Sequence, residues 1–204
     1  MIKSITQWIC AAALAGLATS CVGIKVESWK NPEVGERPMG KTMVLAMAQS
    51  DSLCRQYESM FCMDLQKLGA EARSLHALVQ DAGKLDEEQL VSLLRENGFD
   101  SILVTRLMSE DQQRGIGASN SFPTYYASYW GYYSTVYVSS YGGNQGDIYQ
   151  EYRLETNLYD VKTRSLIWSG RNVVYDDRSS ESNMRGIISA AVYDLKDNGL
   201  LQKK

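Results

Sequence analysis

Between residues 42 and 198, segments whose hydrophobic residues have the spacing of a strand take turns with segments that have the spacing of a helix. This pattern constrains the fold more than any other feature of the chain. Short apolar runs and regular alternation predict strands, whereas recurrence every three or four residues predicts helices. The expected strands cover 42–48, 70–75, 99–108, 152–159 and 166–175. The expected helices cover 50–68, 86–97 and 180–198.

The order of these elements predicts the fold class. Strands and helices alternate first, then a hairpin follows with its tight turn at 160–164, and a helix comes last. This order indicates an α/β fold, a single-domain α/β sandwich with a mixed sheet. We expect the domain to cover residues 41–204, with a tyrosine-rich insertion at about 110–148. A chain of 204 residues with 44% hydrophobic residues is long enough for one compact core.

The first twenty residues have the three parts of an export signal. Lys3 supplies the positive start, an apolar stretch follows from Trp8 to Leu17, and small residues occupy 18–20. The apolar stretch is too short to span a bilayer, which takes about 20 apolar residues. We therefore expect residues 1–20 to be removed on export.

The run Leu17-Ala18-Thr19-Ser20-Cys21 resembles the lipobox of bacterial lipoprotein precursors, although lipoboxes usually carry leucine where Ala18 stands. The resemblance implies that Cys21 is acylated, with palmitate among its chains, and two or more chains anchor a protein stably. Val22, in place of aspartate, implies sorting to the cell outer membrane, with the domain facing the periplasm. Residues 21–40 are expected to form the lipidated N-terminus and a tether, with an edge strand around 24–29. The alternative is an ordinary signal peptide that leaves Cys21 a free thiol.

Further pieces of the chain resemble a family of bacterial lipoproteins of unknown function. They are Ser28-Trp29-Lys30-Asn31-Pro32, the unit from Val44 to Gly69, the run from Gly98 to Leu107, and the run from Leu158 to Gly170. The resemblance implies a fold similar to the N-terminal module of TolB. It brings no catalytic motif, and the family often has glycine where this chain has Arg164.

The remaining candidates for chemistry are few. Cys54 and Cys62 lie eight residues apart in one expected helix, about 12 Å along its axis, which is too far for a disulfide. Both are expected to be free thiols at or near the core. His76 is the only histidine, so a multi-histidine metal site is excluded, and it is expected in a loop or at the surface. We therefore predict no catalytic residue, no metal and no cofactor.

Seven of the thirteen tyrosines lie between residues 122 and 141, and no charged residue occurs between Arg114 and Asp147. Such aromatic density is typical of a recognition surface, and Tyr129, Trp130, Tyr133 and Tyr137 are the candidate partner-binding residues. A flexible low-complexity insertion is the alternative.

The net charge of the chain limits the classes of partner that we expect. The net charge of −3 becomes −4 when Lys3 leaves with the signal, so nucleic acid is not an expected partner. The predicted function is a non-enzymatic binding or envelope-accessory module, held to the membrane by its lipid and meeting an envelope protein or cell-wall glycan. The alternative is an envelope hydrolase that uses Cys62 or an acidic pair.

Overall fold

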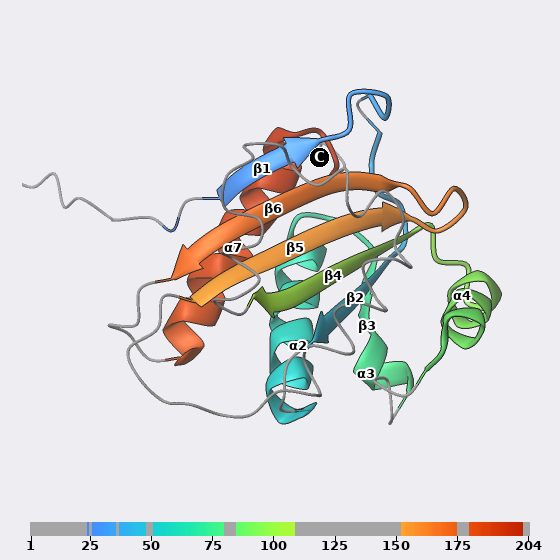
Figure 1. The fold of residues 1–204 in the computed structure, drawn as a ribbon, viewed down its shortest axis with the longest axis horizontal. Helices are drawn as coiled ribbons and strands as arrows, with labels where there is room; N and C mark the ends of the chain where they lie inside the picture. The colour runs from blue at the N-terminus through green and yellow to red at the C-terminus, as the bar shows by residue number, and fades with distance from the viewer. Residues whose placement is uncertain are drawn as a thin grey trace, which may run out of the picture.

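The computed structural model describes residues 24, 26–35, 37–47, 51–79, 85–108, 152–174 and 180–201. A six-stranded sheet in the order β1-β6-β5-β4-β2-β3 forms its centre (Figure 1). Strands β2, β3 and β4 run parallel, whereas β4, β5, β6 and β1 pair antiparallel. The predicted α/β class and mixed sheet are therefore confirmed.

The bounds of the elements agree closely with the predicted ones. The strands are β1 (Val26–Lys30), β2 (Thr42–Met47), β3 (Ala72–Ser74), β4 (Ser101–Met108), β5 (Tyr152–Asp160) and β6 (Leu166–Val174). The helices are α2 (Asp51–Lys67), α3 (Leu75–Leu78), α4 (Glu87–Glu96) and α7 (Ser180–Asp197). The predicted edge strand is confirmed as β1, whereas the single turn α3 was not predicted.

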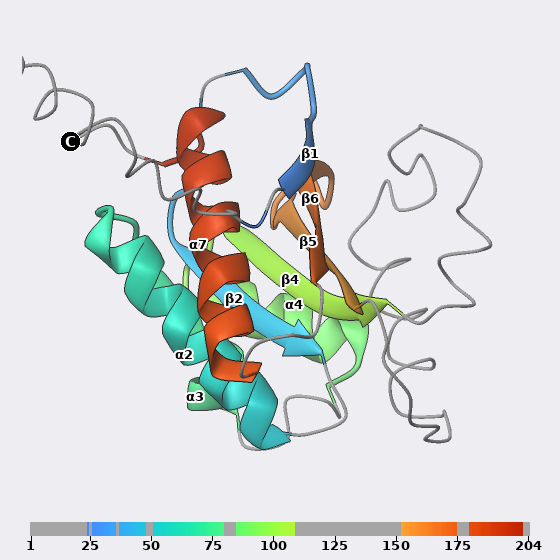
Figure 2. The ribbon, with the colours of Figure 1, turned by 90° about the vertical axis from the view of Figure 1, so that its left-hand side faces the viewer.

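Helices α2 and α7 lie side by side on one face of the sheet (Figure 2). Their apolar stripes meet residues of the central strands, so that Phe61, Leu103 and Trp168 are fully buried. Such stripes recur because every third or fourth residue of a helix returns to the same side. This face contains the larger part of the core.

The second apolar cluster lies on the other face and includes α4. Leu90 and Leu94 of α4 pack with Ile102 of β4 in this cluster. Helix α4 begins with a capping box, in which the Asp86 side chain accepts a hydrogen bond from the Gln89 backbone N–H and Gln89 Oε1 accepts one from the Asp86 backbone N–H. A capping box satisfies backbone donors that the first helical turn leaves free.

Strand β1 is fastened to α7 through Asp194. The Oδ1 atom of Asp194 accepts a hydrogen bond from Ser28 Oγ at 2.9 Å, and Oδ2 accepts one from Trp168 Nε1 at 2.8 Å. Lys30 Nζ donates to the Asn198 carbonyl at 2.7 Å, and cations are favoured at a helix C-terminus. These contacts give a physical role to Ser28 and Lys30, two residues of the segment that carried part of the family resemblance.

The turn between β5 and β6 contains Arg164, whose φ is 60°. Asp160 Oδ1 organises this turn by accepting hydrogen bonds from Thr163 N at 2.7 Å and Thr163 Oγ1 at 3.0 Å. A positive φ is strained for a residue with a Cβ atom and free of strain for glycine. The turn geometry thus explains why glycine suits position 164.

Replacing Arg164 by glycine is expected to raise the free energy of unfolding by about 0.5–1 kcal/mol, because relief of backbone strain exceeds the entropy gained by the unfolded chain. Lys162→Gly is the matched control in the same turn. Lys162 has no positive φ, so its replacement should destabilise the domain. Urea unfolding distinguishes the two signs, and equal destabilisation by both variants would contradict the strain at Arg164.

Candidate functional site

The residues predicted to bind lipid or partner lie outside the described residues. These are Cys21, Tyr129, Trp130, Tyr133 and Tyr137. The structure does place the two strands on either side of the tyrosine-rich insertion, because Met108 at the end of β4 pairs with Arg153 near the start of β5. Strand β4 therefore ends, and β5 begins, at the same end of the sheet.

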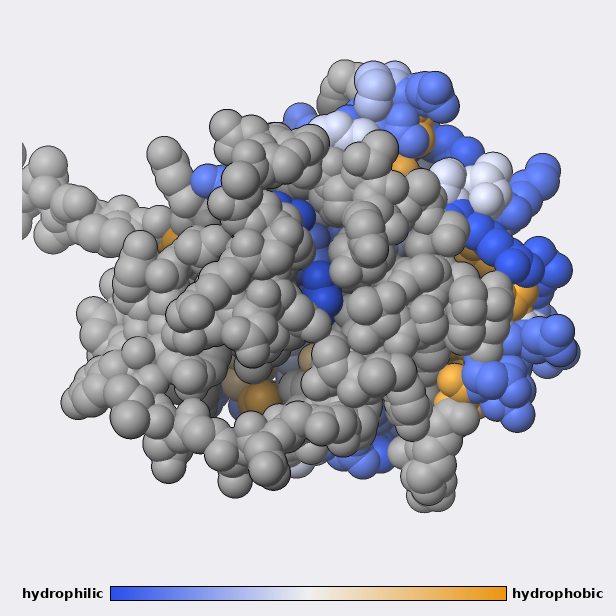
Figure 3. All heavy atoms as spheres, viewed as in Figure 1, coloured by the Kyte–Doolittle hydropathy of each residue, from blue (hydrophilic) through white to orange (hydrophobic). Residues whose placement is uncertain are grey.

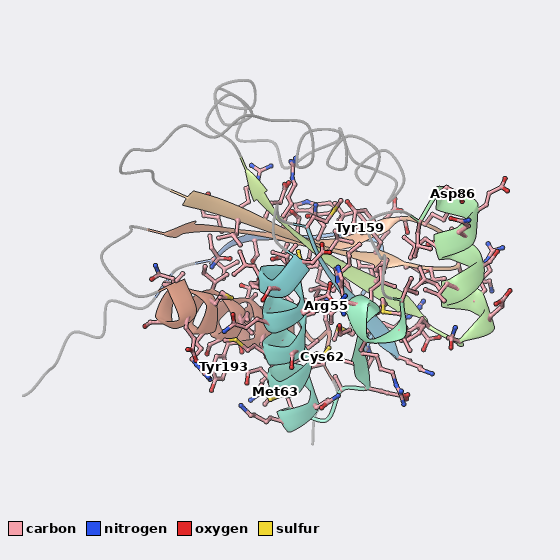
Figure 4. The ribbon with its side chains drawn as sticks, turned by 90° about the horizontal axis from the view of Figure 1, so that it is seen from below. Arg55, Cys62, Met63, Asp86, Tyr159 and Tyr193 are labelled. Carbon is pink, nitrogen blue, oxygen red and sulfur yellow. The ribbon has the colours of Figure 1, made fainter. Side chains whose placement is uncertain are left out.

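A groove of about 860 Å³ lies between α2 on one side and β3 with α3 on the other. Side chains of α2 reach the backbone opposite, where Arg55 Nη1 donates to the His76 carbonyl at 2.9 Å and Gln66 Nε2 donates to the Ala72 carbonyl at 2.9 Å (Figure 4). Because β3 is an edge strand, the Gln66 bond connects the edge of the sheet to α2, and the Arg55 bond connects α3 to the same helix. The apolar lining includes Met63 and Leu78, which are 45% and 40% exposed.

Glu58 lies buried in α2, with no exposed surface, and its carboxylate collects hydrogen bonds from three segments. The Oε1 atom accepts from the Ala46 backbone N–H at 2.9 Å and lies 2.7 Å from His76 Nδ1. The Oε2 atom accepts from Ser74 Oγ and from the His76 backbone N–H. Glu58 thereby joins the end of β2, the end of β3 and the start of α3 to one point on α2.

The prediction that His76 is a loop or surface residue is wrong. His76 is only 5% exposed and contacts Glu58 from the first turn of α3. The physical reason is that a buried carboxylate needs donors, and the imidazole together with its own backbone N–H supplies two of them. A carboxylate within the apolar stripe of 50–68 was the signal in the sequence.

Cys54 and Cys62 are both buried and neither forms a disulfide, as predicted. Cys62 borders the groove together with His76. Burial, and secondarily the nearby Glu58 charge, raises the pKa of the Cys62 thiol to about 12. A reactive cysteine needs its thiolate, which this environment disfavours at neutral pH.

The raised thiol pKa predicts that stability falls as the solution becomes alkaline. The unfolded thiol ionises near its ordinary pKa of 9.0, whereas the folded one stays protonated to about 12, so proton release favours unfolding between these values. Urea midpoints measured from pH 7.5 to 10.5 should fall more steeply for the parent than for Cys62→Ala. Tyr57, whose pKa burial raises to about 12, is common to both proteins. Parallel declines in both proteins would contradict the assignment.

A charged cluster occupies the face of the sheet opposite α2 and α7. Arg106 donates from Nε and Nη2 to Glu155 Oε2 at 3.0 and 2.8 Å, and Arg171 Nη2 lies 3.3 Å from Glu155 Oε1. Arg106 and Glu155 are 1% and 0% exposed. Next to this cluster on the same face, Asn157 of β5 pairs with Ser169 of β6. The Asn157 amide and the Ser169 hydroxyl are buried without a hydrogen-bond partner among the described residues. The sequence contains no signal for this cluster because its three members come from three different strands.

Two further findings concern only the described part of the chain. No three His, Cys, Asp or Glu side chains gather there in an arrangement that could hold a metal ion. No helix there combines the length and the apolar character needed to cross a bilayer.

The chain is similar to solved structures of other proteins. The PelC dodecamer from Paraburkholderia phytofirmans has a chain 14% identical, with 89% of this chain and 99% of that chain covered at a TM-score of 0.47. Lipoprotein GNA1162 from Neisseria meningitidis is 13% identical, with 80% and 99% covered at a TM-score of 0.40. The structural neighbours thus include a bacterial lipoprotein. No family model and no curated protein matches the chain. The expected similarity to TolB stays a prediction.

Proposed function

We propose that this chain is a lipoprotein, acylated at Cys21 and anchored to the outer membrane, whose periplasmic domain binds an envelope partner without catalysis. The observation that carries the proposal is the position of the fold relative to the predicted cleavage site. All described elements begin at or after Val26, so cleavage before Cys21 removes none of them. The predicted export signal and the described elements therefore occupy different parts of the chain.

The chemistry of the residues at the groove favours a binding function over hydrolysis by Cys62. A thiol whose pKa is about 12 is a poor nucleophile at neutral pH, and both oxygens of Glu58 are already engaged by donors. The groove does bring Cys62 and His76 to one surface, with Glu58 beside His76, which favours the hydrolase alternative. Maleimide labelling of Cys62 at pH 7 decides between them, because binding predicts a slow reaction and thiol catalysis predicts a fast one.

The partner is an envelope protein or cell-wall glycan, and Tyr129, Trp130, Tyr133 and Tyr137 are its proposed contacts. Replacing these four together by serine is expected to abolish partner capture, since large aromatic side chains dominate interface energies. The free energy of unfolding should change little. Photo-crosslinking in the native envelope, followed by pull-down on peptidoglycan, measures capture by either class of partner.

Tyr152→Ser, just outside the insertion, is the matched control and should leave capture intact. Normal capture by the fourfold variant would place the binding surface elsewhere. If the lipidated parent repeatedly captures neither envelope protein nor peptidoglycan, the binding function itself is wrong.

A further inference from the structure

Ile24 has a fixed position on the domain, only three residues after the proposed lipid site. A Cβ atom added to Gly186, within α7, would come within 2.5 Å of Ile24 Cδ1. Glycine inside a helix costs about 0.5–1 kcal/mol relative to alanine, so α7 accommodates this close approach at the expense of its own stability. Ile24 is therefore packed against the body of the protein.

The distance from Cys21 to this contact is short. Three residues span at most about 11 Å when fully extended. Directly afterwards, β1 begins at Val26, pairs with β6 and is held to α7 through Ser28 and Asp194. The lipid is thus separated from the folded body by residues 22 and 23 alone.

The strand register shows which end of the domain lies near the lipid. Val26 pairs with Asn172, close to the end of β6, and Gly186 lies in the first half of α7. Both belong to the end at the left of Figure 1, where β1 and α7 begin and β6 ends. We call this the anchor end. At the distal end, Lys30 contacts Asn198 and the turn at Lys162 joins β5 to β6.

The two ends are well separated, because nine residues of β5 rise about 30 Å along the strand. On the face drawn in Figure 3, the described surface around α4, at the distal end, is mostly hydrophilic. Such a surface suits an aqueous environment away from the bilayer.

We propose that the two-residue connection holds the domain directly on the lipid surface in one orientation, with the anchor end against the headgroups and the distal end pointing into the periplasm. The inference rests on the proposed acylation of Cys21 and goes beyond it by naming the surface that meets the membrane. Because the connection is short, the surface that the anchor end contacts is the lipid surface.

Two exposed positions report this orientation. Arg185, with its side chain 64% exposed, lies next to Gly186 at the anchor end, and exposed Lys162 lies at the distal end. Arg185→Cys and Lys162→Cys each remove one positive charge and accept a bimane label. Cys54 and Cys62 are buried and should take up little label. The acylated full chain is placed in phosphatidylethanolamine and phosphatidylglycerol vesicles that contain nitroxide-headgroup lipid, a short-range quencher.

Quenching at position 185 is expected to be at least three times that at position 162. Inserting twenty Gly and Ser residues between Val22 and Gly23, a flexible chain with a root-mean-square span of about 25 Å, should abolish the difference. Equal quenching at both positions in the acylated parent would overturn the orientation. An unchanged difference after the insertion would overturn the role of the short connection. Palmitate incorporation, measured on the same samples, reports separately on the anchor.

Discussion

Replacing Glu58 by alanine is expected to lower the free energy of unfolding by about 3–5 kcal/mol, a large part of the 5–15 kcal/mol typical of a domain. The reason is that the carboxylate accepts hydrogen bonds from buried donors on three segments. Its removal leaves the backbone N–H groups of Ala46 and His76 unpaired, and each orphaned buried donor costs about 1–3 kcal/mol. The loss should appear in urea unfolding.

Two variants serve as controls for this effect. Glu58→Gln keeps one acceptor oxygen and nearly the same volume, so its destabilisation should be intermediate. Gln56→Ala changes an exposed position of the same helix and should stay within about 0.5 kcal/mol of the parent. If Glu58→Ala were as mild as Gln56→Ala, Glu58 would not be the point that joins β2, β3 and α3 to α2.

Most of the secondary structure could be predicted because its signals are local. The capping box at Asp86 and Gln89 lies within four residues, and the apolar stripe of 180–198 is contained in one helix. The α/β class followed from the order of the elements. The single turn α3 could not be predicted, because it depends on contacts with a helix earlier in the chain. Ser74 caps the turn, and Glu58 of α2 accepts hydrogen bonds from Ser74 Oγ and from the His76 backbone N–H.

The residues of the candidate site likewise fall into those with a local signal in the sequence and those without one. Cys21 is identified by the residues directly before it, so its prediction needs no fold. The groove needs α2 placed against β3, and the Arg106 and Glu155 pair needs the register of β4 and β5, which brings these residues opposite each other. Both depend on segments far apart in the sequence, and the sequence alone contained no signal for either pairing.

Replacing Cys21 by serine is expected to release the protein from the membrane. A serine hydroxyl does not accept the diacylglycerol that the lipobox cysteine receives, and without acyl chains the domain has no anchor of comparable strength. Membrane fractionation should move most of the protein from the membrane to the soluble fraction. Cys62→Ser is the matched control, since Cys62 lies buried in the domain, and it should leave fractionation unchanged.

Incorporation of labelled palmitate tests the lipoprotein assignment most directly, because it reads the covalent bond itself. The parent and Cys62→Ser should both carry the label, and Cys21→Ser should carry none. An unlabelled parent, or equal label on Cys21→Ser, would contradict acylation at Cys21 and with it the membrane-anchored function.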